Sequence, residues 1–383
     1  MKVGIVSSFR AQCGVALHTE NIVSETIKLV DSLKIFAEYI TPPDKELPSR
    51  FPELQIDYER CWYRDAHLDL LETKILEYSP DIVEIEFNSG FFLEWQYQIN
   101  SPFQNFVANL KSNGIKIIFY VHDVPTEFPY PPQLREWYKK IDVPMMVGNS
   151  SLVGGIKRWY PEADVHIMRT YVPKTNVYKK DVARQKLNLK QEDFLITQTG
   201  FYSTDKGMKE LIETIPDIHI PNLKIVFAGG IHPFAFDDNR MYIKNCIQAA
   251  IKNKVTDKIV FVNKSFLTKE EFELYCSATD FFIFNMASLF GLGGSMSGGL
   301  ATPFGKPILT SKSTRLLEFT DEVNCKKFNS DQLAETVMNV YKDKEMQKKI
   351  SEGALNMAQE LSAEKSAKRI VELYQKCLSK TCQ

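Results

Sequence analysis

The sequence predicts an α/β protein with two doubly wound, Rossmann-like domains, and three observations lead to this prediction. The chain has 383 residues, which is too long for one ordinary domain and suits two. Short continuous runs of valine, isoleucine and phenylalanine alternate with longer amphipathic stretches, as βαβ units around a buried parallel sheet require. A polar, charged segment at residues 172–190 interrupts this alternation, and we place the link between the domains there.

The first half of the chain predicts an N-terminal domain, residues 1–172. Continuous apolar runs are typical of strands that are buried on both faces. Short apolar runs, several of them continuous, lie at residues 3–6, 35–40, 81–87, 115–121, 143–148 and 165–168. Helices are expected between them, including residues 15–30, 68–78 and 101–112.

The second half repeats the pattern and predicts a C-terminal domain, residues 173–361. Its expected strands are residues 194–199, 223–228, 258–262, 280–284 and 307–310. Its expected helices are residues 208–215, 240–254, 269–278, 332–341, 344–361 and, beyond the domain, 363–378. Thr268 and Glu271 form a T-x-x-E capping box, which predicts where the helix at 269–278 begins. Two such domains leave a cleft at the carboxyl ends of their strands, where open α/β sheets bind ligands.

Composition narrows the classes of function. The chain is 44% hydrophobic and 25% charged, with 47 Lys and Arg residues against 48 Asp and Glu residues. This balance argues against a nucleic-acid partner, which normally requires an excess of basic charge. The seven cysteines are scattered and form no C-x-x-C pair, so we expect reduced thiols rather than a zinc site or a disulfide framework. We also expect no membrane span and no signal peptide, and therefore a cytoplasmic protein, because the apolar runs are too short for either.

The most informative motif is the turn Gly200-Phe201-Tyr202-Ser203-Thr204-Asp205-Lys206-Gly207. It follows an expected strand and precedes an expected helix. Its glycines permit tight backbone geometry, and Lys206 adds a point charge within reach of a phosphate group. An ordinary strand-to-helix turn with an exposed lysine is the alternative interpretation.

A glycine-rich segment follows the expected strand at 280–284, with five glycines among residues 291–299. Glycines are costly inside a helix or strand and useful where backbone approaches a ligand closely. Ser295 and Ser297 are candidates to cap a helix and to bond phosphate oxygens. A flexible surface loop is the alternative, since the segment matches neither the Walker pattern nor a G-x-G-x-x-G fingerprint.

Two further motifs lie at the strands of the first half. His122-Asp123 ends the apolar run at 115–121, where a histidine can bond a sugar hydroxyl or a developing charge. A structural histidine is the alternative. Glu84 and Glu86 fall on one face of their expected strand and are candidates to orient an acceptor, with Glu94 beyond them. The other interpretation is a pair of edge charges that meet Lys or Arg.

Two other segments carry weaker signals. The loop at residues 7–18 contains Arg10, Gln12 and His18 but lacks the dinucleotide fingerprint, so an oxidoreductase is disfavoured. The aromatic and basic clusters at residues 135–140 and 157–160 are candidates for weak contact with an anionic membrane surface. Faces of amphipathic helices are the alternative.

In their order along the chain, these motifs resemble the family-4, or group 1, retaining glycosyltransferases of GT-B fold, over nearly the whole length. In the first half the resemblance lies in Cys13-Gly14, residues 81–92, His122-Asp123 and Asn149-Ser150. In the second half it lies in Lys206-Gly207, Ala228-Gly229-Gly230-Ile231-His232-Pro233, residues 266–280, residues 297–301 and Gly305-Lys306-Pro307. The tail at residues 354–374 resembles the last helices of the family, which cross back, so residues 362–383 are expected to pack toward the N-terminal domain.

The resemblance implies an architecture and a reaction. In GT-B proteins two Rossmann-like domains face each other across a cleft. Family members transfer a sugar from a nucleotide diphosphate sugar with retained configuration, usually without a required metal or a cofactor. We therefore expect a hexosyltransferase that uses GDP-mannose or a UDP-sugar and a glycan, lipid-linked or small sugar acceptor. A place in polysaccharide biosynthesis at the inner face of the membrane, and a homodimer, are further expectations.

The resemblance also implies roles for particular residues. Lys206 matches the basic residue on the donor diphosphate, and His122 matches a residue near the transferred sugar, so these are the predicted catalytic residues. The predicted donor-binding residues are Gly14, Gly200, Lys206, Gly229, Ser297, Gly298 and Gly299, and no metal ligand is expected. The mechanism implied is stabilisation of the departing diphosphate by positive charge and N–H dipoles, with domain closure excluding water.

Two departures from the family keep other functions open. Many members carry a basic residue soon after the glycine of the Lys206 turn, where this chain has Phe201. Many also carry two glutamates for the sugar and the ribose, whereas residues 288–300 contain no acidic residue. The alternatives are a catalytically silent GT-B scaffold that binds a partner enzyme, and a sugar-nucleotide epimerase.

Overall fold

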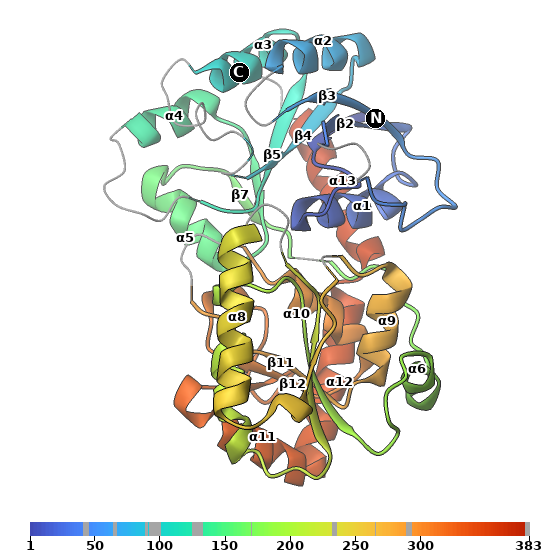
Figure 1. Cartoon of the computed structure of the whole chain (residues 1–383). Helices are drawn as coiled ribbons and strands as arrows, with labels where there is room; N and C mark the ends of the chain where they lie inside the picture. The colour runs from blue at the N-terminus through green and yellow to red at the C-terminus, as the bar shows by residue number, and fades with distance from the viewer. Residues whose placement is uncertain are drawn as a thin grey trace. The chain divides into compact units, whose positions relative to one another are not determined.

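The structure is a computed structural model that describes residues 1–40, 46–63, 67–88, 91, 101–124, 133–169, 171–231, 236–264, 266–288 and 293–379. The chain divides into two compact units, each with its own parallel sheet (Figure 1). Unit 1 comprises Met1–Thr170, Ala363–Gln383 and a short piece that ends at Gly294. Unit 2 comprises Tyr171–Leu289 and Ser295–Ser362. The expected division at residue 172 lies close to the one observed.

The sheet of unit 1 has seven parallel strands in the order β3-β2-β1-β4-β5-β6-β7. The strands are β1 (Lys2–Ser7), β2 (Ser32–Glu38), β3 (Asp57–Trp62), β4 (Ile82–Phe87), β5 (Lys116–Val121), β6 (Met145–Val147) and β7 (Val165–Ile167). Every residue of β4 is buried, Glu84 and Glu86 included, as expected of a central strand that is covered on both faces. The strand order reverses between β1 and β4, which is where doubly wound sheets bind ligands.

Helices cover the two faces of this sheet differently. One face packs an apolar core of strand residues such as Val83, Ile85 and Phe119 against α2 (Leu68–Tyr78), α3 (Pro102–Ser112), α4 (Gln133–Ile141) and α5 (Ser150–Trp159). On the other side α1 (Gly14–Thr26) and α13 (Ala363–Ser379) pack against each other, the first and last long helices of the chain (Figure 1). Because side chains alternate along a strand, Glu84 and Glu86 point away from the apolar core of Val83 and Ile85.

The sheet of unit 2 has six parallel strands in the order β10-β9-β8-β11-β12-β13. They are β8 (Phe194–Thr199), β9 (Leu223–Ala228), β10 (Ile259–Phe261), β11 (Phe281–Phe284), β12 (Ile308–Ser311) and β13 (Lys326–Phe328). The helices of this unit are α6 (Lys180–Lys186), α7 (Met208–Thr214), α8 (Phe236–Lys252), α9 (Lys269–Ala278), α10 (Met296–Ala301), α11 (Leu333–Lys342) and α12 (Lys344–Glu360). Thr268 and Glu271 form the predicted capping box at the start of α9.

Two strands that sequence patterns did not predict, β3 and β13, lie at sheet edges. β3 contains Asp57, Glu59 and Arg60, and β13 begins with two lysines. An edge strand pairs on one side only and accepts charged residues, so it lacks the continuous apolar run that marks a central strand. The absence of that run explains why both were missed.

The expected link at residues 172–190 is wrong in part, because it contains α6 and belongs to unit 2. Arg184 of α6 is 1% exposed and donates to Asp280 Oδ2 at 2.7 Å, to the Ala278 carbonyl at 3.1 Å and to the Gln191 carbonyl at 2.6 Å. The polar sequence of this segment therefore predicted a linker. The structure instead has a helix there, anchored by a buried ion pair.

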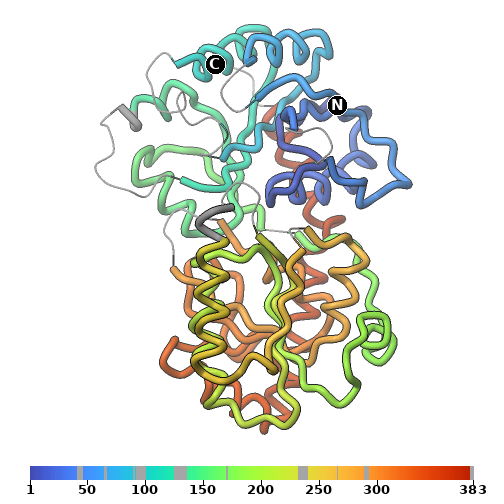
Figure 2. Tube along the Cα trace, in the orientation of Figure 1, coloured from blue at the N-terminus to red at the C-terminus, as the bar shows by residue number. Residues whose placement is uncertain are grey.

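Apart from the short piece that ends at Gly294, the chain leaves unit 1 at Thr170 and returns to it at Ala363 (Figure 2, where the returning segment is red). α13 then packs on α1, and the Tyr374 hydroxyl donates to Glu84 Oε2 of β4 at 2.6 Å. None of the six cysteines in the described residues forms a disulfide, and all six are buried. Cys382, Glu94, His232 and Pro233 lie outside the described residues.

Candidate functional site

The predicted site residues fall into two groups, one in each unit. In unit 2 the strand order reverses between β8 and β11, so ligands of this sheet are expected near the carboxyl ends of those strands. Gly200 directly follows β8, and Asn285 directly follows β11. The Asn285 side chain donates to the carbonyl of Gly207 at 3.0 Å, which joins the Lys206 turn to the next strand of the sheet.

Close backbone packing explains several glycines at this point. Gly207 has φ +60°, and a Cβ there would lie 2.2 Å from the carbonyl oxygen of Asn285. Gly200 has φ +115°, and its Cβ would lie 2.7 Å from Ser297 Oγ. A Cβ at Gly229 would lie 1.9 Å from the Gly200 carbonyl oxygen. The structure therefore brings Gly200, Gly229 and Ser297 together.

Lys206 is buried at the end of this turn, with 9% of its surface exposed. The alternative of an ordinary turn with an exposed lysine is therefore wrong. Its Nζ lies 3.8 Å from Asp205 Oδ2, and the other oxygen of Asp205 accepts from the Ser203 hydroxyl. Burial, and then the charge of Arg315, lower the pKa of Lys206 to about 8, against the opposing effect of Asp205. A buried cation of this kind gains most from an anionic ligand.

Arg315 is the second cation of the cluster, and sequence reasoning missed it. Its Nη1 pairs with Asp205 Oδ2, and its carbonyl accepts from the Ser295 amide at 2.9 Å. Arg315 lies in the short helix Thr314–Leu316, which Ser313 caps just after β12. A signal was present, since β12 neighbours β11 and its carboxyl end reaches the same edge of the sheet. Polar residues that follow β12 were therefore candidates.

The glycines at 298 and 299 have a structural explanation. Ser295 caps α10: its hydroxyl accepts from the Gly298 amide at 3.3 Å and its carbonyl accepts from the Gly299 amide at 3.2 Å. A Cβ at Gly298 would lie 2.9 Å from the ring of Phe319. The predicted capping role of Ser295 is confirmed, while Ser297 lies inside α10. The amides of Gly298 and Gly299 already have acceptors within the protein.

The second group lies at the carboxyl edge of the sheet in unit 1. His122 follows β5, Glu86 lies on β4, and His18 lies on α1. His122 Nε2 shares a hydrogen bond with Glu86 Oε2, and His18 Nε2 lies 3.6 Å from Glu86 Oε1. The His18 ring lies 4.2 Å from the ring of Tyr120 and 4.8 Å from that of His122, centroid to centroid. Ligand atoms of His18, Glu86 and His122 lie within 4.8 Å of one another.

Burial shifts the ionisation of this cluster toward neutral forms. Desolvation raises the pKa of Glu86 to about 8 and lowers that of His122 to about 4. Desolvation, and then the charge of Glu86, raise the pKa of Glu84 well above its ordinary value. Desolvation, and then His122, lower the pKa of His18 well below its ordinary value. Two carboxyl groups and two imidazoles therefore share one buried, low-dielectric environment.

The prediction that Glu84 and Glu86 share one face is confirmed, and the alternative of edge charges is wrong. Both residues are 0% exposed on a central strand. Their partners are Tyr374 for Glu84 and the two histidines for Glu86. Sequence alternation could identify the shared face but not the burial, because α1 and α13 come from opposite ends of the chain.

Gly14 begins α1, where Cys13 is the N-cap and its Sγ accepts from the Ala16 amide at 3.3 Å. Gly14 is exposed, with no atom within 4 Å of a Cβ placed on it. His18 lies one turn further along the same face of the helix. Gly14 and His122 thus belong to unit 1, whereas the other predicted donor-binding residues belong to unit 2.

The aromatic and basic cluster at residues 135–140 lies on α4, and its aromatic side chains point inward. Trp137 is 0% exposed and Tyr138 is 2% exposed, within the apolar core of unit 1. These rings are therefore unavailable to a membrane surface, as the amphipathic-helix alternative predicted. No helix in the described parts of the chain combines the length and the apolar character that crossing a bilayer requires.

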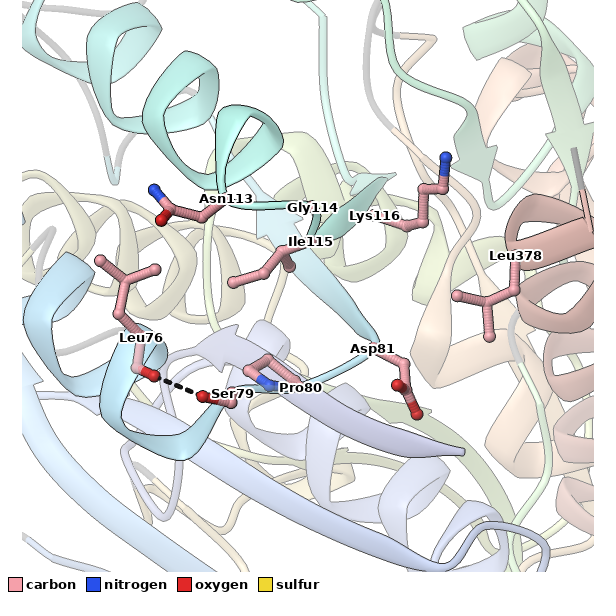
Figure 3. Close-up of a pocket in the computed structure, with 9 residues that line it drawn as sticks. All are labelled: Leu76, Ser79, Pro80, Asp81, Asn113, Gly114, Ile115, Lys116 and Leu378. Carbon is pink, nitrogen blue, oxygen red and sulfur yellow. Dashed lines mark hydrogen bonds between the residues drawn. The ribbon is translucent and has the colours of Figure 1, made fainter. Parts of the chain in front are cut away.

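A pocket of about 390 Å³ opens at the other edge of the sheet in unit 1 (Figure 3). Asp81, just before β4, and Lys116, at the start of β5, line it together with Leu378 of α13. The Asp81 carboxylate accepts from the Lys2 amide at 2.7 Å. This is the amino edge of the strands, whereas open α/β sheets bind ligands at the carboxyl edge. The pocket therefore does not mark the functional site.

Comparisons with known proteins agree with the class of fold described above. Residues 179–357 match the family described as glycosyl transferases group 1. This match confirms the predicted resemblance over the part of the chain that holds Gly200, Lys206, Gly229 and Ser297. A comparison with curated protein sequences finds no match.

Solved structures share the fold over the whole chain. Sucrose-phosphate synthase from Thermosynechococcus elongatus has a TM-score of 0.76 at 14% identity, covering 99% of both chains. A glycosyltransferase from Rickettsia africae has a TM-score of 0.78 at 13% identity, covering 99% of this chain and 100% of that one. HepE from Anabaena, in complex with UDP, has a TM-score of 0.74 at 14% identity, covering 98% of this chain and 100% of its own. The fold class is that of the GT-B glycosyltransferases.

Proposed function

We propose that this protein is a retaining hexosyltransferase that moves a hexose from a nucleotide diphosphate sugar to a carbohydrate acceptor. One observation carries the proposal: two cations, Lys206 and Arg315, are held around Asp205 at the carboxyl edge of the unit 2 sheet. The glycine backbone of Gly200 and Gly229 lies at the same edge, and this unit matches the group 1 glycosyltransferases.

The chemistry that these residues support is stabilisation of a leaving group. When the bond between the sugar and the diphosphate breaks, negative charge grows on the diphosphate oxygens. Lys206 and Arg315 would stabilise that charge in a partly buried site, where electrostatic interactions are stronger than in water. Asp205 holds the guanidinium of Arg315 in place and shares its carboxylate with Lys206. Arg315 thus supplies the second positive charge that Phe201 does not.

We propose a UDP-sugar or GDP-mannose as the donor, without a cofactor or a required metal, and a glycan, lipid-linked or small sugar as the acceptor. Support for a uridine nucleotide comes from the similar HepE structures, which are complexes with UDP and UDP-glucose. Retained configuration follows from the family resemblance. A homodimer, and an electrostatic contact of exposed basic residues such as Lys139 and Lys157 with an anionic membrane, are subsidiary hypotheses.

A thermal-shift panel of UDP, GDP, ADP and their sugar conjugates tests the proposal, first without metal and then with it. A ligand at 100 times its Kd stabilises the folded protein by ~2.7 kcal/mol, which moves Tm by a few degrees. We expect a shift with one nucleotide and its sugar conjugate, followed by release of that nucleotide when an acceptor is added. Folded protein that responds to none of them would instead support the scaffold hypothesis.

A further inference from the structure

The hydrogen bond between Glu86 and His122 determines which nitrogen of the imidazole can meet a ligand. Glu86 Oε2 engages Nε2 of His122, so Nδ1 is the ring nitrogen that remains for other partners. Glu86 is 0% exposed on β4, whereas the His122 side chain is 17% exposed at the edge of the sheet. The carboxyl group is therefore inside the protein, and the imidazole lies between it and the surface.

Titratable groups face this pair from several neighbouring elements among the described residues. Glu84 lies on the same strand, Tyr120 on β5, His18 on α1 and Tyr374 on α13, and Asp123 follows His122. Tyr120 donates to the Met168 carbonyl at 2.7 Å, and Tyr374 donates to Glu84 at 2.6 Å. None of these groups holds a fixed positive charge against Glu86. Burial, the larger effect, raises the pKa of Glu86 to about 8, against the lowering effect of the hydrogen bond with Glu84.

A metal ion is a competing explanation for two imidazoles and a carboxylate in one place. A tetrahedral zinc site with bonds of about 2.0–2.1 Å has ligand atoms about 3.3 Å apart. Here the ligand atoms spread over distances up to 4.8 Å, and His122 Nε2 is already hydrogen-bonded to Glu86. The geometry fits a shared proton better than a shared cation.

We propose that Glu86 is a positioning residue whose protonation state sets which ring nitrogen of His122 carries the proton. With Glu86 protonated, its O–H donates to Nε2, and the ring proton is on Nδ1, which is then a donor. When Glu86 loses its proton to solvent, the carboxylate accepts from Nε2–H, the ring proton moves from Nδ1 to Nε2, and Nδ1 becomes an acceptor. One proton leaves and the imidazole stays neutral throughout.

Burial places this change in an accessible range, since desolvation raises the pKa of Glu86 to about 8. The expected effect on a sugar ligand rests on the proposed function, because only the family resemblance places His122 near the transferred sugar. A hydroxyl of that sugar would meet a donor at Nδ1 below about pH 8 and an acceptor above it.

Nitrogen-15 NMR of the histidine side chains in the free protein tests the tautomer directly, with His122→Gln used to assign the signals. In the wild-type protein we expect the protonated nitrogen of His122 to change from Nδ1 to Nε2 between pH 6 and pH 9. In Glu86→Gln, which keeps the shape and removes the ionisation, we expect a single tautomer throughout. A wild-type tautomer that does not change over this range would overturn the proposal, whatever the variants do.

Glu20→Gln is the matched control. Glu20 is a buried carboxyl of the same unit, and desolvation raises its pKa too, but its oxygen accepts from the Ser49 hydroxyl and the Arg50 amide. We expect Glu20→Gln to leave the His122 titration unchanged. Equal loss of the titration in both variants would show a general effect of disturbing unit 1 and contradict a specific role for Glu86.

The contribution of the sugar to donor binding gives an independent readout. UDP alone reports on the unit 2 cations, whereas the ratio of the affinities for UDP-glucose and UDP reports on the sugar. One hydrogen bond gained or lost corresponds to about a two- to tenfold change. We expect that ratio to change by this amount through pH 8 in the wild type and to be constant in Glu86→Gln.

The outcomes separate the inference from the function on which it rests. If no nucleotide or sugar nucleotide of the thermal-shift panel binds, the proposed function fails while the NMR result still stands. Metal analysis of the purified protein is the last experiment, and it tests for a bound metal ion. Stoichiometric zinc that is lost in Glu86→Gln would overturn proton sharing and assign the cluster to a metal.

Discussion

At the scale of single residues, the charge of Lys206 depends on pH near neutrality. The buried side chain has a pKa of about 8, lowered from 10.5 chiefly by desolvation. A diphosphate binds the protonated amine better than the neutral one, and binding in turn favours protonation. The neighbouring Arg315 supplies the second positive charge around Asp205.

We expect Lys206→Ala and Arg315→Ala each to weaken nucleotide diphosphate binding by about 10- to 150-fold, because each removes a charge-assisted hydrogen bond worth ~1.5–3 kcal/mol. In the wild type, affinity should also fall as the pH rises through about 8, where Lys206 loses its proton. In Arg315→Ala this fall should move to higher pH, because the charge of Arg315 contributes to lowering the pKa of Lys206. Isothermal titration calorimetry with the nucleotide found in the thermal-shift panel measures both effects.

Lys209→Ala is the control for these variants. Lys209 lies three residues after Lys206, but it is 40% exposed and pairs with Glu213 at 2.8 Å. Its removal should change affinity less than twofold. Equal losses at Lys206 and Lys209 would indicate that net charge, rather than the buried cluster, attracts the ligand.

At the scale of elements, α6 shows how one buried ion pair can hold a polar segment in place as a helix of unit 2. Arg184 and Lys180 both pair with Asp280 at 2.7 Å. The Arg184 side chain is 1% exposed and that of Lys180 is 45% exposed. Burial should therefore decide what each pair contributes to stability.

We expect Arg184→Ala to lower the free energy of unfolding of unit 2 by ~3–5 kcal/mol, because it leaves Asp280 without its buried partner. Lys180→Ala should cost ~0–1 kcal/mol, as an exposed pair does. Urea denaturation of both variants, followed by circular dichroism, measures the difference. Similar small losses for the two variants would mean that α6 is held by its apolar contacts instead.

The junction of the loops after β8 and β9 is the second element with a clear steric requirement. Gly229→Ala places a Cβ 1.9 Å from the Gly200 carbonyl oxygen, so the two loops must move apart. We expect it to abolish nucleotide binding, as measured by the same calorimetry. Gly154→Ala is the control, since its Cβ on α5 has nothing within 4 Å. That substitution should leave binding intact and stabilise the helix by up to ~1 kcal/mol.

At the scale of the whole molecule, the buried cluster of unit 1 should make stability depend on pH in two directions. The folded protein holds the Glu86 proton up to a pKa of about 8, while the unfolded chain releases it near 4.5. Stability is therefore lost as pH rises through that window. Burial lowers the pKa of His122 from 6.5 to about 4, so stability is also lost as pH falls below 6.5.

We expect Glu86→Gln to raise Tm relative to the wild type more at pH 8 than at pH 5, because the amide cannot ionise in the buried site. Differential scanning calorimetry at the two pH values measures the effect. The opposite trend, with the larger gain at pH 5, would mean that Glu86 is ionised in the folded protein.

The outline of the fold was predictable because local sequence patterns specify its helices and central strands. Continuous apolar runs predicted the central strands, and the capping box at Thr268 predicted the start of α9. Edge strands such as β3 and the anchored helix α6 were not predictable in this way. Their stability comes from pairing and from one buried contact, which hydrophobic periodicity does not record.

The sequence by itself determined the fold class, the order of the motifs and the choice of Lys206 and His122 as candidates. Tertiary structure decided what surrounds them. Arg315 meets Asp205 across 110 residues of sequence, and Tyr374 meets Glu84 across 290. A residue's charge and its free partners depend on burial and on neighbours from distant segments, and both arise only when the sheets and their covering helices have assembled.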